Sequence, residues 1–273
     1  MKAQVFVNGI PQHQISVSDR GLQFGDGLFE TIAVINGKPC RLNQHLKRLE
    51  KGLNVLQIEN VNLEQLASFL KSKLTLSDTG IAKIIVTRGS GSEGYRPVED
   101  LAANIIVYLK PYDKFIHRDK LQPVNICHCK TPISVNRLTA GFKHLNRIDQ
   151  VMATLECQNK GFDDGLLGLD DEIIEATSSN LFLWKDSSLY TPDLHQAGIA
   201  GIARESVLQI AKEKNIQCII DKISIEQCHK ADALFLTNSI TPVKPVLKLE
   251  HTDYSKQAWP THLYQEIIDH VYS

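Results

Sequence analysis

The chain of 273 residues is long enough for one or two domains. Its 30 basic and 31 acidic residues leave a formal net charge of −1, so charge gives no reason to expect a nucleic acid or an anionic membrane as a partner. Hydrophobic residues make up 42% of the chain and charged residues 22%, which excludes a disordered protein and is typical of a globular one.

The amino-terminal segment predicts a strand and a turn. Residues 4–7 alternate in hydrophobicity and end at Asn8-Gly9, a pair typical of hairpin turns. The segment lacks the apolar core of a signal peptide. No window of the chain approaches the run of about 18 apolar residues that a membrane span needs. We therefore expect a cytoplasmic protein with no membrane partner.

The rest of the first third mixes strands with amphipathic helices. A strand over residues 28–35 ends in a second Asn-Gly pair, which begins a hairpin. Asn43 is the expected N-cap of a helix with leucines on one stripe. Further predicted elements follow in order: a helix over residues 62–74, strands over 84–88 and 104–109, and between these strands a glycine-rich loop over 89–97.

A polar segment that contains a proline follows the strand over residues 104–109 and predicts a domain boundary. We expect a smaller amino-terminal domain over residues 1–110, a linker over 111–119 and a larger carboxy-terminal domain over 120–273. The second domain is predicted to contain strands over residues 122–129, 165–169, 181–184, 188–190, 217–220 and 233–237, and helices over 141–156 and 203–214. Because strands and helices do not alternate strictly, the α+β class fits better than a doubly wound sheet.

Six cysteines are scattered through the chain, at positions 40, 127, 129, 157, 218 and 228. The run Cys127-His128-Cys129 is compatible with a metal site. On a strand, however, the two cysteines point to one face and the histidine to the other, and no second cluster completes four ligands. We interpret the cysteines as ordinary buried thiols and predict no metal, with metal or redox chemistry as the alternative.

Several residues have both a chemical and a plain structural interpretation. The glycines over residues 89–94 match a dinucleotide pattern, but Pro97 opens no helix after them, so a substrate-facing loop is favoured. Residues 198–205 place glycines before a helix, which suits an anion but also an ordinary turn. Lys143 offers a nucleophilic amine, although its position alone favours a solvated lysine. Glu175, and the pair His45 and Arg48, are equally compatible with solvent-facing positions.

The order of six segments carries more information than any one of them. They lie at residues 25–31, 45–49, 143–147, 175–182, 201–204 and 237–243, and read GDGLFET, HLKRL, KHLNR, EATSSNLF, GIAR and TNSITPV. In this order and spacing the chain resembles the fold-type IV pyridoxal-phosphate enzymes. That superfamily includes branched-chain aminotransferases, D-amino-acid aminotransferases and aminodeoxychorismate lyases. The resemblance extends from about residue 4 to about residue 247.

The resemblance implies a two-domain homodimer that binds pyridoxal 5'-phosphate. Lys143 would carry the cofactor covalently, and Glu175 would hold a proton on its ring nitrogen. The implied phosphate donors are Arg48, the backbone N–H groups of Ile202 and Ala203, and Thr237 and Asn238. The hydroxyls of Ser178 and Ser179 would add donors near either the cofactor ring or its phosphate. The implied contacts to a small-molecule substrate are Thr31, Arg88, Tyr95, Arg96 and Arg147.

Within the superfamily, three segments are similar to the aminodeoxychorismate lyases: residues 18–27, 86–95 and 143–147. The implied reaction converts 4-amino-4-deoxychorismate to 4-aminobenzoate and pyruvate, an oxo-acid lyase step of folate biosynthesis. The alternative is an aminotransferase of the same fold acting on D- or branched-chain amino acids. A non-enzymatic binding protein is disfavoured because both Lys143 and Glu175 are present.

Overall fold

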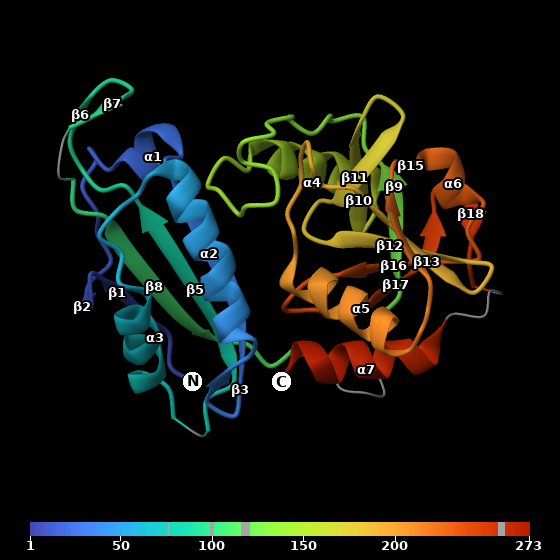
Figure 1. Cartoon of the computed structure of the whole chain (residues 1–273), viewed down its shortest axis with the longest axis horizontal. Helices are drawn as coiled ribbons and strands as arrows, with labels where there is room; N and C mark the ends of the chain where they lie inside the picture. Colours follow the sequence, from blue (N-terminus) through green and yellow to red (C-terminus); the bar gives the residue numbers. More distant parts are fainter. Residues whose placement is uncertain (76, 99–100, 116–120, 256–259) are drawn as a thin grey trace. The chain divides into compact units, whose positions relative to one another are not determined.

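The computed structural model describes residues 1–75, 77–98, 101–115, 121–255 and 260–273. Contacts divide the chain into two compact units (Figure 1). The first comprises Met1–Phe115, Phe142–Asn146 and Tyr272, and the second comprises Ile116–Gly141, Arg147–Val271 and Ser273. Both units combine helices with sheets, which confirms the predicted α+β class.

An antiparallel sheet of six strands forms the first unit, in the order β2-β1-β8-β5-β3-β4. The strands are β1 (Gln4–Val7), β2 (Ile10–Pro11), β3 (Gly27–Ile35), β4 (Lys38–Pro39), β5 (Gly80–Thr87) and β8 (Asn104–Pro111). Helices α2 (Leu42–Leu56) and α3 (Leu63–Ser72) pack on the sheet (Figure 1). One hydrophobic cluster joins both helices to alternate residues of the strands, because successive strand side chains point to opposite faces.

The first residues of the helices in this unit show which capping residues the local sequence identifies. Asn62 caps α3, because its side chain accepts a hydrogen bond from the backbone N–H of Gln65 at 2.8 Å. Asn43 does not cap α2, which begins one residue earlier and is preceded by Arg41 in a left-handed conformation with φ of 52°. The sequence did not predict the short helix α1 (Arg20–Phe24), which Asp19 caps by accepting from the N–H of Gly21.

Lys143 lies in an extended segment and not in a helix. The predicted helix over residues 141–156 begins only at α4 (Ile148–Lys160). The carbonyl of Lys143 accepts from the N–H of Phe29 at 2.8 Å, and the N–H of Leu145 donates to Gly27 at 3.0 Å. These bonds to β3 use backbone groups that a helix would need. They also join this segment to the first unit, whereas sequence order assigned Lys143 to the carboxy-terminal domain.

A ten-stranded mixed sheet forms the second unit, in the order β14-β13-β12-β16-β17-β9-β10-β11-β15, with β18 paired to β17. The pairs β9–β10, β9–β17 and β13–β14 are parallel. The strands are β9 (Val124–His128), β10 (Asp164–Leu169), β11 (Glu172–Ala176), β12 (Asn180–Lys185), β13 (Ser188–Pro192), β14 (Cys218–Asp221), β15 (Ile223–Ser224), β16 (Ala233–Thr237), β17 (Lys244–Leu249) and β18 (Thr252–Asp253).

Four helices described in the second unit are α4, α5 (Ile202–Glu213), α6 (Ile225–His229) and α7 (Thr261–Val271). Helices α5 and α7 lie side by side (Figure 1). On α7, Tyr264 packs its ring edge-on to Phe235 of β16, and Phe235 stacks on Phe182 of β12. These contacts anchor α7 on the sheet. Among the helices of the described residues, none combines the length and apolar composition needed to cross a membrane.

The strand β11 was not predicted from the sequence, which left Glu175 compatible with a solvent-facing position. Residues from Ile173 to Ala176 are all buried, and the successive residues Ile173 and Ile174 pack into two different hydrophobic clusters, so both faces of β11 are covered. A strand that neighbours cover on both faces shows no alternation to detect. Residues 116–119 of the predicted linker lie outside the described part of the chain, and β8 continues through Pro111.

The apolar stripe of α4 faces outward. Ile148, Val151, Met152 and Leu155 are 66%, 51%, 50% and 47% exposed, whereas Ala153 and Cys157 on the opposite side are buried against the sheet. These four side chains form an apolar face of α4 that no described residue covers. A run of four such residues is unusual on a free surface.

Candidate active site

A buried ionic cluster lies between β3 and α2 in the first unit. Glu30 of β3 accepts two hydrogen bonds from Arg48 of α2, from Nε at 2.8 Å and from Nη2 at 2.6 Å. His45, one turn earlier on α2, meets the same carboxylate through Nδ1 at 2.6 Å. All three residues are buried, so the alternative of a solvated stripe at His45 and Arg48 is wrong. The bidentate pair fixes the plane of the Arg48 guanidinium.

Charge within this cluster keeps Glu30 ionised. Burial alone would raise the pKa of its carboxyl, but the charge of Arg48, together with His45, lowers that pKa to about 2. Burial lowers the pKa of His45 despite the attraction of Glu30, and the charges of Arg48 and Lys143 add to this effect. The imidazole is therefore neutral and donates its Nδ1–H to Glu30. The first unit thus presents one fixed guanidinium near the amine of Lys143.

The amine of Lys143 lies over the ring of Phe29, with Nζ 4.5 Å from the ring centroid. Thr31, two residues further along β3, points to the same face as Phe29 because strand side chains alternate. The first unit therefore brings Lys143 and Thr31 to one face of β3. Lys143 is half-buried, which differs from a lysine extended into solvent.

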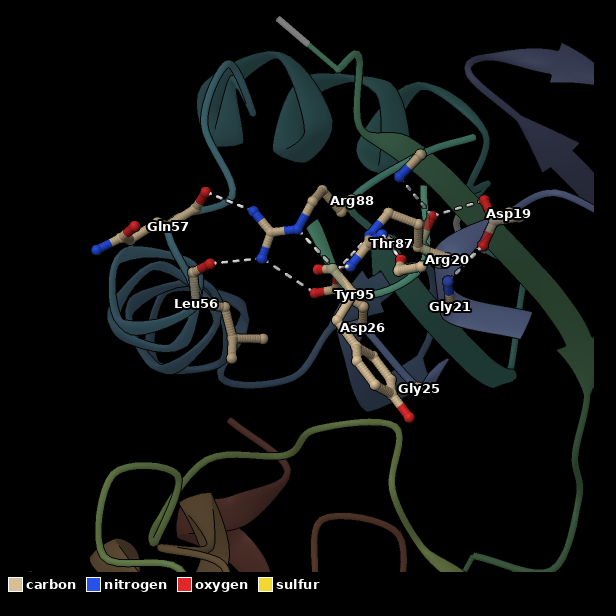
Figure 2. Close-up of polar contacts among 12 residues, drawn as sticks. Asp19, Arg20, Gly21, Gly25, Asp26, Leu56, Gln57, Thr87, Arg88 and Tyr95 are labelled. Atoms are coloured by element: carbon tan, nitrogen blue, oxygen red, sulfur yellow. Dashed lines mark hydrogen bonds and ion pairs between the residues drawn. The ribbon is translucent and has the colours of Figure 1, made fainter. Parts of the chain in front are cut away.

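Arg88 has a structural task that the sequence did not indicate. It donates to Asp26 from Nε at 2.7 Å and from Nη2 at 3.0 Å, and to the carbonyls of Leu56 and Gln57 at the end of α2 (Figure 2). These contacts use four of the five N–H groups of the guanidinium. The guanidinium of Arg88 is thus engaged within the first unit, and its predicted contact with substrate stays a prediction.

Asp26 joins two arginines and ties the glycine-rich loop to them. Arg20 donates to Asp26 at 2.8 Å and to the carbonyls of Gly94 and Tyr95 at 3.1 and 3.0 Å (Figure 2). Burial would raise the pKa of Asp26, but hydrogen bonds and charge from Arg88 and Arg20 lower it. The loop leads into the hairpin of β6 (Ser92–Glu93) and β7 (Arg96–Pro97), and not into the helix of a dinucleotide site.

The substrate candidates on this hairpin are exposed within the chain. The side chain of Tyr95 is 85% exposed, with its ring 5.4 Å from that of Phe24, and Arg96 is also exposed. Arg20 holds the backbone carbonyls of the β6–β7 turn, whereas the side chains of Tyr95 and Arg96 remain exposed. Their predicted contact with substrate stays a prediction.

Glu175 of β11 is held by a backbone amide and a carboxamide in the second unit. Its Oε2 accepts from the N–H of Ile199 at 2.8 Å, and its Oε1 accepts from Gln150 of α4 at 3.2 Å. The exposed fraction is 3%, so the alternative of a solvent-facing tip is wrong. Gly198 has φ of 84°, and a Cβ there would come within 2.8 Å of Ile174 and 3.2 Å of Glu175. Only glycine allows the loop to approach this carboxylate so closely.

Arg147 of the predicted substrate set lies beside Glu175. It immediately precedes α4, and burial lowers the pKa of its guanidinium while the charge of Glu175 opposes that effect. The structure therefore places Arg147 in the electrostatic field of Glu175.

The start of α5 and the end of β16 form a cradle of polar groups. Gly201 precedes Ile202 and Ala203 at the helix start, where the first N–H groups have no partner within the helix. A Cβ on Gly201 would lie 2.1 Å from Oδ1 of Asn180. Asn180 is the strand partner of Thr237 and donates to the carbonyl of Ile199 at 2.8 Å. An anion at this helix start would be stabilised by the free N–H groups and the helix dipole.

The hydroxyl of Thr237 is suited to meet a bound group. Thr237 is fully buried, and its Oγ1 has no hydrogen-bond partner within the described residues. A buried hydroxyl without a partner is costly, so a bound group is expected to meet it. Asn238 is used differently: its side chain accepts from Ile240 and Thr241 and donates to Ser178 and Ser179. Ser179 is buried and Ser178 is exposed.

Sequence reasoning missed Glu30, Gln150 and Asn180. Glu30 and Asn180 both stand inside recognised motifs, GDGLFET and EATSSNLF, and a polar residue within an otherwise apolar strand was the available signal. Gln150 had no such signal, because it lies in the first turn of a helix whose start was predicted elsewhere.

Comparison with known proteins gives consistent results. The family model described as amino-transferase class IV matches residues 27–249. Aminodeoxychorismate lyase of Vibrio harveyi is 32% identical over 244 residues, which cover 88% of this chain and 89% of that protein. The crystal structure of 4-amino-4-deoxychorismate lyase from Pseudomonas aeruginosa aligns with a TM-score of 0.89 and 36% identity, covering 96% of this chain and 97% of that one. D-alanine aminotransferase of Staphylococcus aureus is 26% identical, with coverage of 90% and 89%.

Glu30→Gln is expected to weaken folding at neutral pH and to flatten its acid dependence. The folded pKa of about 2 lies below the ordinary value of 4.5, so Glu30 stabilises the fold above about pH 4.5. This contribution is lost as pH falls toward 2. Removing the charge should lower the free energy of unfolding by about 3 kcal/mol at pH 7. Urea unfolding at pH 7 and pH 3 measures this, with Glu64→Gln on exposed α3 as control. Equal losses in the two variants would contradict it.

Asp26→Asn is expected to lower the free energy of unfolding by about 3 kcal/mol, because it leaves Arg20 and Arg88 without their shared charge. It should also speed proteolysis of the hairpin at Gly94 and Tyr95, whose carbonyls Arg20 holds. Chemical unfolding and limited proteolysis measure the two effects, with the exposed Asp171→Asn as control. If Asp26→Asn lowers the free energy of unfolding but leaves the rate of hairpin proteolysis unchanged, Asp26 does not hold the loop.

Proposed function

Because this chain belongs to the class IV aminotransferase family, we propose that it is a lyase converting 4-amino-4-deoxychorismate to 4-aminobenzoate and pyruvate. The similarity to the Pseudomonas aeruginosa lyase carries the proposal, with 36% identity over nearly the full length of both chains. The Vibrio harveyi lyase supports it independently, at 32% identity. The product assigns the enzyme to folate biosynthesis.

The cofactor of this family is pyridoxal 5'-phosphate, and the residues present fit it. The buried hydroxyl of Thr237 without a partner in the described chain, next to the glycine-led start of α5, suits a phosphate. We assign the phosphate to Thr237, Asn238, Arg48 and the N–H groups of Ile202 and Ala203. Ser178 and Ser179 are assigned to the cofactor as hydroxyl donors near its ring or its phosphate. Lys143 supplies the amine that carries the cofactor, and Glu175 is the partner of its ring nitrogen.

When bound, pyridoxal phosphate withdraws electrons from the carbon that bears the substrate amine. Glu175 keeps a proton on the ring nitrogen, since its carboxylate is held by the amide of Ile199 and by Gln150. Lys143 Nζ acts as general base at the carbon that bears the amine, and a proton is returned to the departing group. Proton transfer by one positioned amine contributes about 100- to 10,000-fold to rate.

Bond changes in the proposed reaction balance without an oxidant. The C–H bond at the amine-bearing carbon and the C–O bond to the enolpyruvyl group break. The ring becomes aromatic, and the enolpyruvyl group leaves as pyruvate after taking up a proton. Aromatisation supplies much of the driving force, so the protein mainly positions and ionises groups. The candidates to contact the substrate and its two carboxylates are Thr31, Arg88, Tyr95, Arg96 and Arg147.

The test of this proposal is product formation. Purified enzyme with pyridoxal phosphate and 4-amino-4-deoxychorismate should release 4-aminobenzoate, seen by fluorescence, and an equal amount of pyruvate, measured with lactate dehydrogenase. Without both products the lyase assignment fails.

An aminotransferase acting on D- or branched-chain amino acids is the second candidate, supported by the D-alanine aminotransferase relative. It would use the same Lys143 and Glu175, so these residues do not discriminate. Mixing enzyme with D-alanine, or with L-leucine, in the absence of an oxo acid distinguishes the two. A transaminase converts its cofactor stoichiometrically to the pyridoxamine form, whereas a dedicated lyase does not.

Lys143→Ala is expected to fold but to lose nearly all activity, since no amine remains to carry the cofactor. Borohydride reduction followed by peptide mapping should label Lys143 in the wild type. Lys83→Ala is a matched control, because Lys83 Nζ also lies over the Phe29 ring, at 5.1 Å. A label on any lysine other than Lys143 overturns the assignment.

Glu175→Gln is expected to bind the cofactor yet to slow turnover about a hundredfold or more, because the charge that retains the ring proton is lost. Steady-state rates at saturating cofactor measure this effect. Glu172→Gln, on the same strand and paired with Lys222 at 3.1 Å, is the control and should retain activity. Normal turnover in Glu175→Gln would assign Glu175 a structural role.

We further propose a homodimer in the cytoplasm, with the exposed apolar face of α4 as a surface that a second copy covers. Ile148→Glu is expected to shift the protein toward monomer, because a charge there cannot be buried without a partner. Analytical ultracentrifugation measures this, with Val55→Glu on the exposed side of α2 as control. A dimer constant unchanged by Ile148→Glu excludes this face.

A further inference from the structure

Three cysteines converge beneath α4, and none of them is among the residues assigned to the proposed reaction. Cys127 lies on β9, Cys129 follows it, and Cys157 lies on α4. The Sγ atom of Cys157 is 3.6 Å from the Sγ atoms of both Cys127 and Cys129. All three sulfurs lie within 4.8 Å of one another, and all six cysteines of the chain are free thiols. The sequence indicated only Cys127 and Cys129 as a possible cluster, because Cys157 is distant in the chain and lies on a different element, α4.

The local fold makes room for this cluster. Strand alternation points Cys127 and Cys129 to one face, and α4 packs on β10 over that face. Gly165 of β10 lies beneath the sulfurs, where a Cβ would be 2.4 Å from Sγ of both Cys129 and Cys157. Any side chain at position 165 would therefore displace the thiols. The missing side chain creates the space in which they meet.

The surroundings are apolar and closed. Cys127, Cys129 and Cys157 are 1%, 5% and 2% exposed, and share a core with Ile133, Leu167 and further buried aliphatic residues. Burial raises the pKa of the Cys127 thiol to about 12 and raises that of Cys129 as well. The nearby charges of Glu156 and Lys160 are paired with each other at 2.6 Å. Cys127 and Cys129 are therefore protonated, and the apolar surroundings of all three sulfurs disfavour a buried net charge.

The net charge of the complex determines which thiol-binding metal or metalloid the three cysteines can hold in these apolar surroundings. Copper(I) with three thiolates has a net charge of −2, and zinc(II) with three has −1 and needs a fourth ligand. Burying such a charge in an apolar pocket is costly. Trivalent arsenic takes three thiolates and no more, and the complex is neutral. One centre bonded to sulfurs at about 2.3 Å holds them less than about 4.6 Å apart, which fits the observed separations after small shifts.

We propose that Cys127, Cys129 and Cys157 form a binding site for trivalent arsenic, taken up as uncharged arsenous acid. Three S–H bonds and three As–OH bonds break, and three As–S bonds form, so that As(OH)₃ and three thiols give As(SR)₃ and three water molecules. No atom changes oxidation state, and no oxidant or reductant is required. Because neither the ligand nor the product is charged, entry avoids the desolvation cost that excludes a cation. The site does not depend on the proposed lyase reaction.

The test uses the full-length enzyme with bound pyridoxal phosphate and sodium arsenite, in buffer free of small thiols. Arsenic retained after desalting is measured by elemental analysis. Denaturing mass spectrometry checks for the mass of one arsenic less three hydrogens. Thiols that react with a disulfide reagent are counted in denaturant. The variants are Cys157→Ala and Cys129→Ala, with Cys228→Ala on α6 as a matched buried cysteine outside the cluster.

The wild type and Cys228→Ala should each retain one arsenic per chain and lose three reactive thiols. Cys157→Ala and Cys129→Ala should bind at least tenfold more weakly, with circular dichroism and cofactor absorbance unchanged. If one variant fails to fold, the other carries the test. Arsenic absent from the wild type, or retained equally by both cluster variants, overturns the proposal. Stoichiometric uptake of zinc(II) or copper(I) in its place overturns the charge argument.

Discussion

A buried carboxylate is the constraint on which the first unit depends. Glu30 is an ionised group within a sheet, and it is tolerated because Arg48 and His45 both reach it from α2. The requirement to satisfy that charge fixes the position of α2 over β3. It also fixes the guanidinium of Arg48, which is the kind of preorganised cation that a phosphate needs.

In the second unit, backbone groups position the polar side chains of the candidate site. The amide of Ile199 holds Glu175, while the carbonyl of the same residue accepts from Asn180 beside Thr237. One loop therefore links the carboxylate to the polar cradle at the start of α5. Asp164 holds the turn that follows β11. Its carboxylate accepts from the hydroxyl of Thr177 at 2.6 Å and pairs with Lys244 at 2.6 Å. Groups positioned by backbone contacts lose little mobility when a ligand binds.

Local patterns predicted many elements of the chain but failed where distant backbone groups compete. β1 follows from alternation, β16 from a continuous apolar run, and α3 from the helical spacing of its apolar residues. The helix predicted around Lys143 does not form, because the backbone on either side of His144 bonds to β3. β11 was missed because its burial on both faces removes alternation. Arg88 illustrates the same limit for side chains, since its partners lie about 30 and 60 residues away along the chain.

The sequence by itself determined the family, because six short motifs in fixed order identify the fold and name Lys143, Glu175 and Arg48 as candidates. It also determined the class of structure, since hydrophobic periodicity is a local property of the chain. Only the tertiary structure decided which groups satisfy one another. Glu30 for Arg48, Gln150 for Glu175 and Cys157 for Cys127 are pairings across 18, 25 and 30 positions. No local periodicity encodes such pairings, because the sheet register and helix packing that create them arise only when the whole unit folds.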